Sequence, residues 1–380
     1  MSMMLRILRL MAEKKASDVY LSPGAPALIK INGQCLPVNA QPLARDATLR
    51  LLAEVLTPER VEELEDTGEL NMALPLEGVG NYRISGLRQR GLYSAVIRFI
   101  APVVPELASL NVPPILADLV MEKRGLVLVV GATGSGKSTT LASMLDHRNA
   151  RVSGHILTIE DPVEFLLTHK KSVVNQREVG SDTSSMQMGL KNALRQAPDV
   201  IMIGEIRDRE TMSAALAYAQ SGHLCLATLH ANNSYHVLNR ILSFYPVEVR
   251  ATMLGDLSSA LRAVVSQRLL RTKDGQRIPA VEVMLNTQLI ASMIETADFN
   301  GVKEAMEKSM TEGSQTFEQA IADLIRSDRV DRKEGLAHAD SPTNLIWRLQ
   351  NDFTKASQAA PEPDTKDDTP TFTEFSVDLH

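Results

Sequence analysis

A complete phosphate-loop pattern, G-x-x-x-x-G-K-S, occupies residues 131–138. The apolar run 126–130 before it predicts a buried parallel strand, and the segment 139–146 after it predicts the opening of a helix. Glycines in such a loop let backbone N–H groups point at phosphate oxygens, and the positive end of the helix faces the same anion. A glycine-rich turn that binds nothing is the alternative, but chance seldom supplies these parts in order. The chain is therefore predicted to bind a nucleoside triphosphate.

Residues of this loop have distinct expected tasks. Lys137 is expected to reach the β- and γ-phosphates, and the hydroxyl of Ser138 is expected to take a place on Mg²⁺. The predicted nucleotide-binding residues are Gly131, Thr133, Gly134, Ser135, Gly136, Lys137, Ser138 and Thr139.

Composition limits the classes of function. At 380 residues the chain is long enough for two domains, since domains run to roughly 100–200 residues each. The net charge is −6, aromatic residues make up only 4%, and Trp347 is the single tryptophan. A global positive field and a supply of stacking side chains are therefore both lacking, and no nucleic-acid partner is expected.

The sequence contains two cysteines, Cys35 and Cys225. Two cysteines cannot form a disulfide framework or a four-cysteine zinc site. Because Cys225 lies in the apolar run 224–229, buried thiols in a reducing compartment are expected.

Unbroken apolar stretches stay well below the roughly 18 residues that a membrane span needs. The opening segment 1–18 has amphipathic-helix spacing, with apolar side chains at Met4, Leu5, Leu8 and Met11. A helix packed on its own domain is favoured, and attachment to a membrane surface is the alternative. The chain is expected to be cytoplasmic.

The first 100 residues predict a small α+β domain. Asn32-Gly33, between the apolar runs 27–31 and 34–38, is a strong signal for a two-residue hairpin. The proline-rich stretch 102–114 can neither continue a strand nor enter a helix interior, so it is the expected linker. The other elements expected here are helices over 45–56 and from Pro58, and strands over 81–87 and 92–100.

From about residue 112 the pattern alternates between strand and helix. Short apolar runs of this kind fit strands buried on both faces of a parallel sheet. A helix is expected to start within 182–196, with Asp182 as its cap. The expected strands cover 126–130, 156–159, 200–203 and 224–228, and helices without any further strand are expected over 258–270 and 287–329.

The C-terminal segment from residue 352 is polar, acidic and proline-bearing, so it is expected to be disordered. Phe372 and Phe375 leave room there for a short partner-binding motif, and a simple tail is the favoured alternative.

Carboxylates follow two of the expected strands. A hydrolytic triphosphate site needs a metal anchor and a group that orients or deprotonates water. Open α/β sheets place their ligands at the carboxyl ends of strands. The strand over 156–159 runs into Glu160, Asp161 and Glu164, and the strand over 200–203 runs into Glu205. We expect these groups to lie near the phosphates.

Competing interpretations exist for the flanking residues. Acidic helix caps are the alternative for Asp161 and Asp208. Gly204, just before Glu205, is expected to permit close packing against the nucleotide.

Two histidines, His223 and His230, bracket the apolar run 224–229 and are expected near the same sheet edge. A functional role and a structural role are both open for each of them. Zinc is not supported, because no cysteine or third ligand accompanies them at suitable spacing.

Longer motifs carry a resemblance to a known family. Segment 194–208 (LRQAPDVIMIGEIRD) resembles the signature of the type II/IV secretion ATPase superfamily, 156–164 resembles its Asp box, and 222–230 resembles its His box. Together with 174–180 they resemble the twitching-motility retraction ATPases of the PilT/PilU family, over roughly residues 1–345.

This resemblance implies an architecture and a substrate. It implies a small α+β PAS-like domain followed by an α/β RecA-like P-loop ATPase domain with a mostly parallel sheet. ATP would sit between the domains and against the neighbouring subunit of a homo-hexamer, with Mg²⁺ as cofactor. The implied domains are 1–101, a linker over 102–114, the ATPase domain with its C-terminal helices over 115–351, and a tail over 352–380.

The same resemblance implies roles for single residues. Glu164 would activate water, and Glu205 would be the Walker B carboxylate, acting on Mg²⁺ through water. Arginine stays charged and can meet two phosphate oxygens at once. The remaining candidates are Arg83, Arg90 and Arg98 as charge-neutralising arginines, His230 in the catalytic set, and Arg195, Arg207, His223, Glu160 and Asp161 as further motif residues.

Two departures from PilT point to the PilU branch of the family. Segment 288–295 (QLIASMIE) lacks both arginines of the AIRNLIR-like motif found in PilT, and a tail follows residue 352. The resemblance then implies a PilT-like paralogue and inner-membrane pilus base proteins as partners. It also implies a cytoplasmic protein, peripheral at the inner-membrane base of the pilus machine.

Other functions remain as alternatives. A PilB-like extension motor is disfavoured because that class generally has a four-cysteine zinc site. A RecA-like nucleic-acid translocase is disfavoured by the acidic charge and the scarce aromatics. A nucleotide-binding structural or regulatory partner of another hexamer is disfavoured by the presence of Lys137, Glu164 and Glu205.

Overall fold

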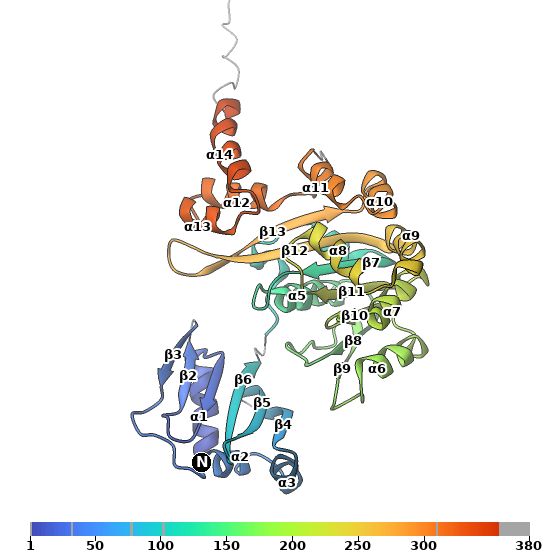
Figure 1. Cartoon of the computed structure of the whole chain (residues 1–380). Coiled ribbons are helices and arrows are strands. Elements are labelled where there is room, and N and C mark those ends of the chain that lie inside the picture. The colour runs from blue at the N-terminus through green and yellow to red at the C-terminus, as the bar shows by residue number, and fades with distance from the viewer. Residues whose placement is uncertain (1, 32, 77–78, 101–102, 309–310, 357–380) are drawn as a thin grey trace, which may run out of the picture.

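The computed structural model describes residues 2–31, 33–76, 79–100, 103–308 and 311–356, with side chains as far as residue 351. Two sheets organise these residues, a six-stranded sheet before residue 103 and a seven-stranded sheet after it (Figure 1). The expected α/β fold with a preceding small α+β domain is confirmed.

Strands of the N-terminal sheet are all antiparallel, in the order β3-β2-β1-β6-β5-β4. The hairpin expected on either side of Asn32-Gly33 is β2 and β3, although Asn32 itself lies outside the described residues. The strands are β1 (Asp18–Leu21), β2 (Leu28–Ile31), β3 (Gln34–Pro37), β4 (Glu69–Leu76), β5 (Gly80–Gln89) and β6 (Leu92–Ile100).

Three helices complete this domain: α1 (Met3–Lys14), α2 (Ala47–Ala53) and α3 (Pro58–Thr67). Helix α1 buries its apolar stripe in the core of its own domain. The buried Tyr82 hydroxyl of β5 donates a 2.7 Å hydrogen bond to the Leu8 carbonyl and fixes the helix on the sheet. The helix therefore packs on its own domain, as favoured over membrane attachment.

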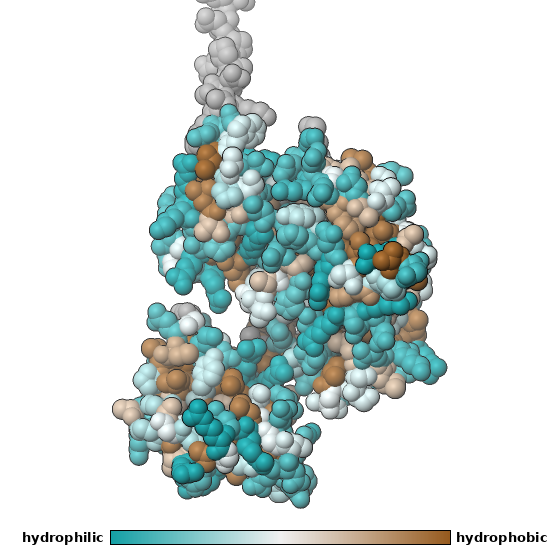
Figure 2. Space-filling view, viewed as in Figure 1, coloured by the Kyte–Doolittle hydropathy of each residue, from teal (hydrophilic) through white to brown (hydrophobic). Residues whose placement is uncertain are grey.

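The connection between the domains is more ordered than a plain linker. A 3₁₀ helix, η1 (Leu107–Leu110), lies within the expected linker, and its Leu107 is buried against the ATPase-domain core. An open gap separates the two domains on the side of the β2–β3 hairpin (Figure 2).

The large sheet has the order β13-β12-β7-β11-β10-β8-β9, and all its neighbours are parallel except β12 and β13. Strands β7, β10 and β11 are buried along their whole length, which explains their unbroken apolar runs. The strands are β7 (Gly125–Val130), β8 (Gly154–Glu160), β9 (Ser172–Glu178), β10 (Val200–Ile203), β11 (Leu224–Leu229), β12 (Leu261–Arg271) and β13 (Arg277–Leu285).

Helices cover both faces of this sheet. On one face α4 (Ile115–Met121) and α5 (Lys137–Asn149) pack on the strands. The other face carries α6 (Met186–Ala193), α7 (Arg209–Gln220), α8 (Ser234–Ser243), α9 (Arg250–Ala260), α10 (Gln288–Glu295) and α11 (Phe299–Lys308), with short 3₁₀ turns η2 (Leu194–Gln196) and η3 (Val247–Val249).

The prediction of a helix over 258–270 is wrong. Helix α9 ends at Ala260, and β12 begins at the next residue without a glycine or proline between them. Strand β12 lies between β7 and β13, and its two faces are buried in the cores on either side of the sheet, with Val264 in one and Val265 in the other, so its apolar residues do not alternate. Such a run cannot be told from a buried helix by periodicity alone.

A separate group of C-terminal helices packs on the end of the β12–β13 hairpin: α12 (Phe317–Arg326), α13 (Arg332–His338) and α14 (Pro342–Ala356). The backbone of α14 continues to residue 356, so the tail expected from residue 352 starts within this helix. Residues 357–380, with Phe372 and Phe375, lie outside the described part of the chain.

Some smaller expectations need correction. The cap of α6 is Ser185, whose side chain accepts from Met188 N, whereas Asp182 Oδ2 accepts a 2.8 Å bond from Glu178 N. Cys225 is buried as expected, but Cys35 is exposed on the edge strand β3. Among the described residues, no helix is both long and apolar enough to cross a membrane.

Candidate functional site

The phosphate loop joins the carboxyl end of β7 to the amino end of α5. Gly131, Gly134 and Gly136 have φ of 154°, 78° and 92°, conformations that side chains rarely adopt. A Cβ on Gly131 would lie 2.5 Å from the Gln267 carbonyl oxygen, and one on Gly136 would lie 2.7 Å from Gln267 Nε2. Glycine is thus required at both positions by the approach of β12.

Lys137 opens α5 and is buried. Its ammonium donates 3.0 Å hydrogen bonds to the carbonyls of Gly131 and Ala132, which hold it across the mouth of the loop. Burial lowers the pKa of Lys137, and the negative charges of Glu205 and Glu164 oppose that shift. Both predicted catalytic carboxylates therefore act on the same ammonium group.

The loop has the features that a polyphosphate ligand requires. The Ser135 hydroxyl is buried without a hydrogen-bond partner among the described residues. The space beside Gly134 is open, and Thr133 is exposed next to it. Ser138 and Thr139 are half-buried in the first turn of α5.

The described residues offer few side chains that could bind a metal ion. The described residues contain no group of three or more His, Cys, Asp or Glu side chains that could hold a metal ion alone. Mg²⁺ usually keeps several waters and binds through one or two protein groups plus substrate phosphates. Ser138 and Glu205 fit such a site, in which the metal would neutralise charge on the phosphates.

Glu205 is the centre of an ionic network at the carboxyl edge of the sheet. Its Oε2 accepts a 2.9 Å bond from Arg207 Nε, and its Oε1 lies 3.2 Å from His230 Nε2. Arg207 Nη1 also reaches Asp161 Oδ2 at 3.2 Å. The hydrogen bond to Glu205 raises the pKa of Arg207. One contiguous network thus joins residues from the three predicted motifs.

Gly204 lies against the backbone of a neighbouring strand. A Cβ at this position would lie 3.1 Å from Glu160 Cα and 3.2 Å from the Ile159 carbonyl oxygen. The glycine therefore permits close approach of β8, and its expected packing against a nucleotide stays a prediction.

Glu160 and Glu164 lie in different environments although both follow β8. Glu160 is buried and accepts hydrogen bonds from Thr158 Oγ1 at 2.7 Å and Gln176 Nε2 at 3.0 Å. Burial raises the pKa of Glu160. Glu164 has an exposed side chain. The Glu160 side chain is thus bonded to residues of β8 and β9, whereas the side chain of Glu164 is accessible.

The three candidate arginines of the N-terminal domain are not equivalent. Arg83 of β5 and Arg98 of β6 are paired directly opposite each other on neighbouring antiparallel strands. Arg98 Nε donates a 3.0 Å bond to the buried Asp18. Arg83 lines a cavity of about 370 Å³ together with Asp161 and Pro162 of the ATPase domain. Arg90 lies in the β5–β6 turn, seven residues and so about 23 Å along the strand from Arg83. Arg83 alone among the three lines this interdomain cavity.

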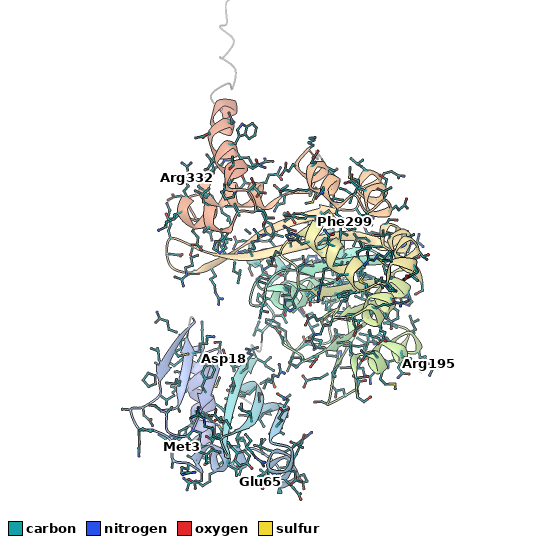
Figure 3. The ribbon with its side chains drawn as sticks, in the orientation of Figure 1. Met3, Asp18, Glu65, Arg195, Phe299 and Arg332 are labelled. Carbon is teal, nitrogen blue, oxygen red and sulfur yellow. The ribbon has the colours of Figure 1, made fainter. Side chains whose placement is uncertain are left out.

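His223 and Arg195 lie at the opposite edge of the sheet from Glu205. Six residues of β11 separate the two histidines, so the expectation that they share a sheet edge is wrong. His223 Nδ1 pairs with the Ser221 hydroxyl at 3.0 Å. Arg195 is exposed in η2, before the amino end of β10 (Figure 3). Asp208 is a helix cap, as its alternative interpretation held, and accepts a 2.8 Å bond from Thr211 N.

Residues of β12 beside the phosphate loop were not predicted. Gln267 Oε1 accepts a 2.8 Å bond from Thr140 Oγ1 of α5 and lies against the phosphate loop. The adjacent β-branched residues Val264 and Val265 were the available signal for a strand here.

Comparisons with known proteins identify the family of the chain. The family model described as type II/IV secretion system protein matches residues 2–337. The chain is 45% identical over 341 residues to the type IV pilus ATPase PilU of Pseudomonas aeruginosa, covering 90% of this chain and 89% of that protein. It is 35% identical over 339 residues to PilT, the type IV pilus retraction ATPase of the same organism, covering 89% and 98%.

A solved structure gives the same overall arrangement. The crystal structure of the pilus retraction motor PilT with bound ADP superposes with a TM-score of 0.84 at 35% identity, and the match covers 91% of this chain and 99% of that one.

Proposed function

Because the chain belongs to the type II/IV secretion system protein family and is an ATPase of that family, we propose that it couples ATP hydrolysis to retraction of type IV pili. The observation that carries the proposal is the network of Asp161, Arg207, Glu205 and His230 beside Lys137. Its residues come from separate parts of the sequence, and the chain shares this fold with a retraction motor that binds ADP.

The residues have the following proposed roles. Lys137 and the glycine loop bind the β- and γ-phosphates, and Ser138 with Glu205 holds Mg²⁺, Glu205 through water. Glu164 acts as the base that accepts a proton from the attacking water, since its exposed carboxylate lies beside the loop. Arg83 is the best-placed arginine to neutralise phosphate charge from the N-terminal domain.

Assembly and partners form part of the proposal. The chain acts as a homo-hexamer at the cytoplasmic base of the pilus machine, together with a PilT-like paralogue. The similarity to PilU, 45% against 35% for PilT, supports the accessory role over that of a motor working alone. The segment of α10, where PilT-like arginines are replaced, agrees with it.

Two assays test this function. Purified protein should hydrolyse ATP in a Mg²⁺-dependent manner, and sedimentation should show a larger hexamer fraction with a slowly hydrolysed ATP analogue. Pilus retraction should then be measured in cells that carry this gene alone, its PilT-like paralogue alone, or both. Retraction that is stronger with both genes supports the proposal, and retraction that never depends on this gene contradicts it.

A further inference from the structure

Three consecutive residues of β12 contact three different parts of the molecule. Gln267 bonds Thr140 of α5 and lies against the phosphate loop. Ser266 and Arg268 point to the other face of the sheet, because side chains alternate along a strand. There Ser266 bonds Glu282, and Arg268 bonds the loop that follows His230.

Arg268 joins this loop to the C-terminal helices. Its Nη2 donates a 3.0 Å bond to the Asn232 carbonyl and also bonds Asp340, and its Nη1 donates to the His338 carbonyl. The guanidinium stands 3.9 Å from the ring centre of Phe317 in α12, within the range of a cation–π contact. Only 19% of the side chain is exposed, so these contacts are shielded from solvent.

Each of the residues 232–234, which follow His230, makes its own hydrogen bond to another part of the chain. Asn233 Nδ2 donates a 2.8 Å bond to Asp340 Oδ2, while its Oδ1 caps α8. The backbone N and the hydroxyl of Ser234 each donate a 2.8 Å bond to Glu282 Oε1 on β13. Residues 232, 233 and 234 are therefore tied in turn to Arg268, Asp340 and Glu282.

We propose that Arg268 and Asp340 are positioning residues for ATP hydrolysis. By fixing residues 232–234, they hold His230 against Glu205, two residues upstream of the first tethered position. Since His338 ends α13 and Asp340 lies between α13 and α14, the position of the C-terminal helices sets the hydrolysis rate through this clamp. The inference rests on the proposed ATPase function and adds a control point to it.

Kinetics of matched variants test the clamp. Arg268→Ala should lower kcat about tenfold or more, because small displacements of catalytic groups are costly, while the affinity for a fluorescent ATP analogue stays within about twofold. Arg268→Lys keeps the charge but loses the planar fork, so its kcat should be intermediate. Asp340→Asn, a gentler change, should lower kcat in the same direction.

Lys273→Ala is the matched control. It removes an ion pair with Asp328, which also joins the β12–β13 hairpin to the C-terminal helices but lies outside the clamp. Its kcat should equal that of the wild type. Equal kcat losses in Lys273→Ala and Arg268→Ala would mean that general docking of the helices matters, and would overturn the proposal.

A double variant separates positioning from structural support. In a His230→Ala background, Arg268→Ala should cause little further loss of kcat, because the residue through which it acts is gone. A full additional tenfold loss would contradict the proposed path through His230.

Hydrogen exchange gives a readout that does not need hydrolysis. The amides of residues 231–236 should exchange faster in Arg268→Ala and Asp340→Asn, and at the wild-type rate in Lys273→Ala. Unchanged exchange in the clamp variants would refute the inference. A wild-type protein that does not hydrolyse ATP would instead refute the proposed function, so the two failures are distinguishable.

Discussion

The carboxyl and amino ends of the strands in the large sheet, its two edges here, carry similar residue types in different arrangements. At the carboxyl edge, Asp161, Arg207, Glu205 and His230 form one ionic network beside the phosphate loop. At the amino edge, polar side chains mainly bond the nearby backbone, as where Asp199 Oδ2 accepts a 2.8 Å bond from His155 N. The difference follows from strand direction, since parallel sheets place their ligands at the carboxyl ends.

A histidine or carboxylate in this fold should be judged by the strand end that it occupies. His155, at the amino end of β8, has its ring nitrogens near the Gln196 carbonyl at 3.0 Å and Asn175 Oδ1 at 2.9 Å. These contacts stabilise the fold locally. Variants at the carboxyl edge should therefore change turnover, and variants at the amino edge should change stability.

The largest expected effect is at the phosphate loop. Lys137→Ala removes the positive charge that faces the phosphates, so turnover should fall by at least about 100-fold in a steady-state ATPase assay, with an unchanged melting temperature. Lys170→Ala is a matched control, since Lys170 pairs with Asp146 near the other end of α5. Wild-type turnover in folded Lys137→Ala protein would remove the nucleotide site from this edge.

Glu164→Gln should lower kcat by about 10²–10⁴-fold, because it removes the proposed base and leaves the phosphate loop intact. Rapid-quench measurements should find ATP bound at wild-type affinity but not cleaved. If the affinity for ATP collapses instead, Glu164 is a structural residue and the base must be sought elsewhere at this edge.

Two histidine variants compare the edges directly. His230→Ala should lower kcat about tenfold without a change in melting temperature, because the ring contacts Glu205. His155→Ala should keep the wild-type kcat and lose about 1 kcal/mol of unfolding free energy, the worth of an intramolecular hydrogen bond. Equal effects of the two variants on kcat would break the distinction between the edges.

The smallest expected effect concerns Glu282, a buried carboxylate beside the carboxyl edge. Burial raises the pKa of Glu282 to about 6, above its ordinary value of 4.5. The folded state then holds a proton that the unfolded state has lost between these pH values, so stability from this group is lost as pH rises from about 4.5 to about 6. The loss amounts to about 2 kcal/mol.

Glu282→Gln should remove that contribution to the pH dependence. Urea unfolding of both proteins at several pH values measures it, because other carboxylates contribute equally to each. A difference in unfolding free energy that does not change between pH 4.5 and pH 6 would contradict the assigned titration.

Much of the site could be predicted because its parts are local in sequence. The phosphate loop is contiguous, and β8, which ends at Glu160, and β10, which ends two residues before Glu205, contain short apolar runs with a distinct boundary. Because these strands are parallel, the residues that follow their carboxyl ends lie together. The small antiparallel domain was predictable in part, through the Asn32-Gly33 turn signal and the Pro58 helix start.

The rest depends on contacts between distant segments. Strand β12 is a strand because β7 and β13 lie on either side of it, and nothing in its own residues excludes a helix. The Arg268 clamp joins residues up to 72 positions apart. The position of His223 was predicted wrongly because the six residues between His223 and His230 form a whole strand. The two histidines therefore lie at its opposite ends.

The most direct test of where the hydrolytic site lies compares two carboxylates that flank one strand. Glu205 follows the carboxyl end of β10, and Asp199 precedes its amino end. Steady-state ATP hydrolysis should be measured for Glu205→Gln and Asp199→Asn at saturating Mg²⁺. We expect a loss of at least about 100-fold for Glu205→Gln and a near-wild-type rate for Asp199→Asn. A near-wild-type rate for Glu205→Gln, or equal losses in both, would contradict the placement of the hydrolytic site at the carboxyl edge.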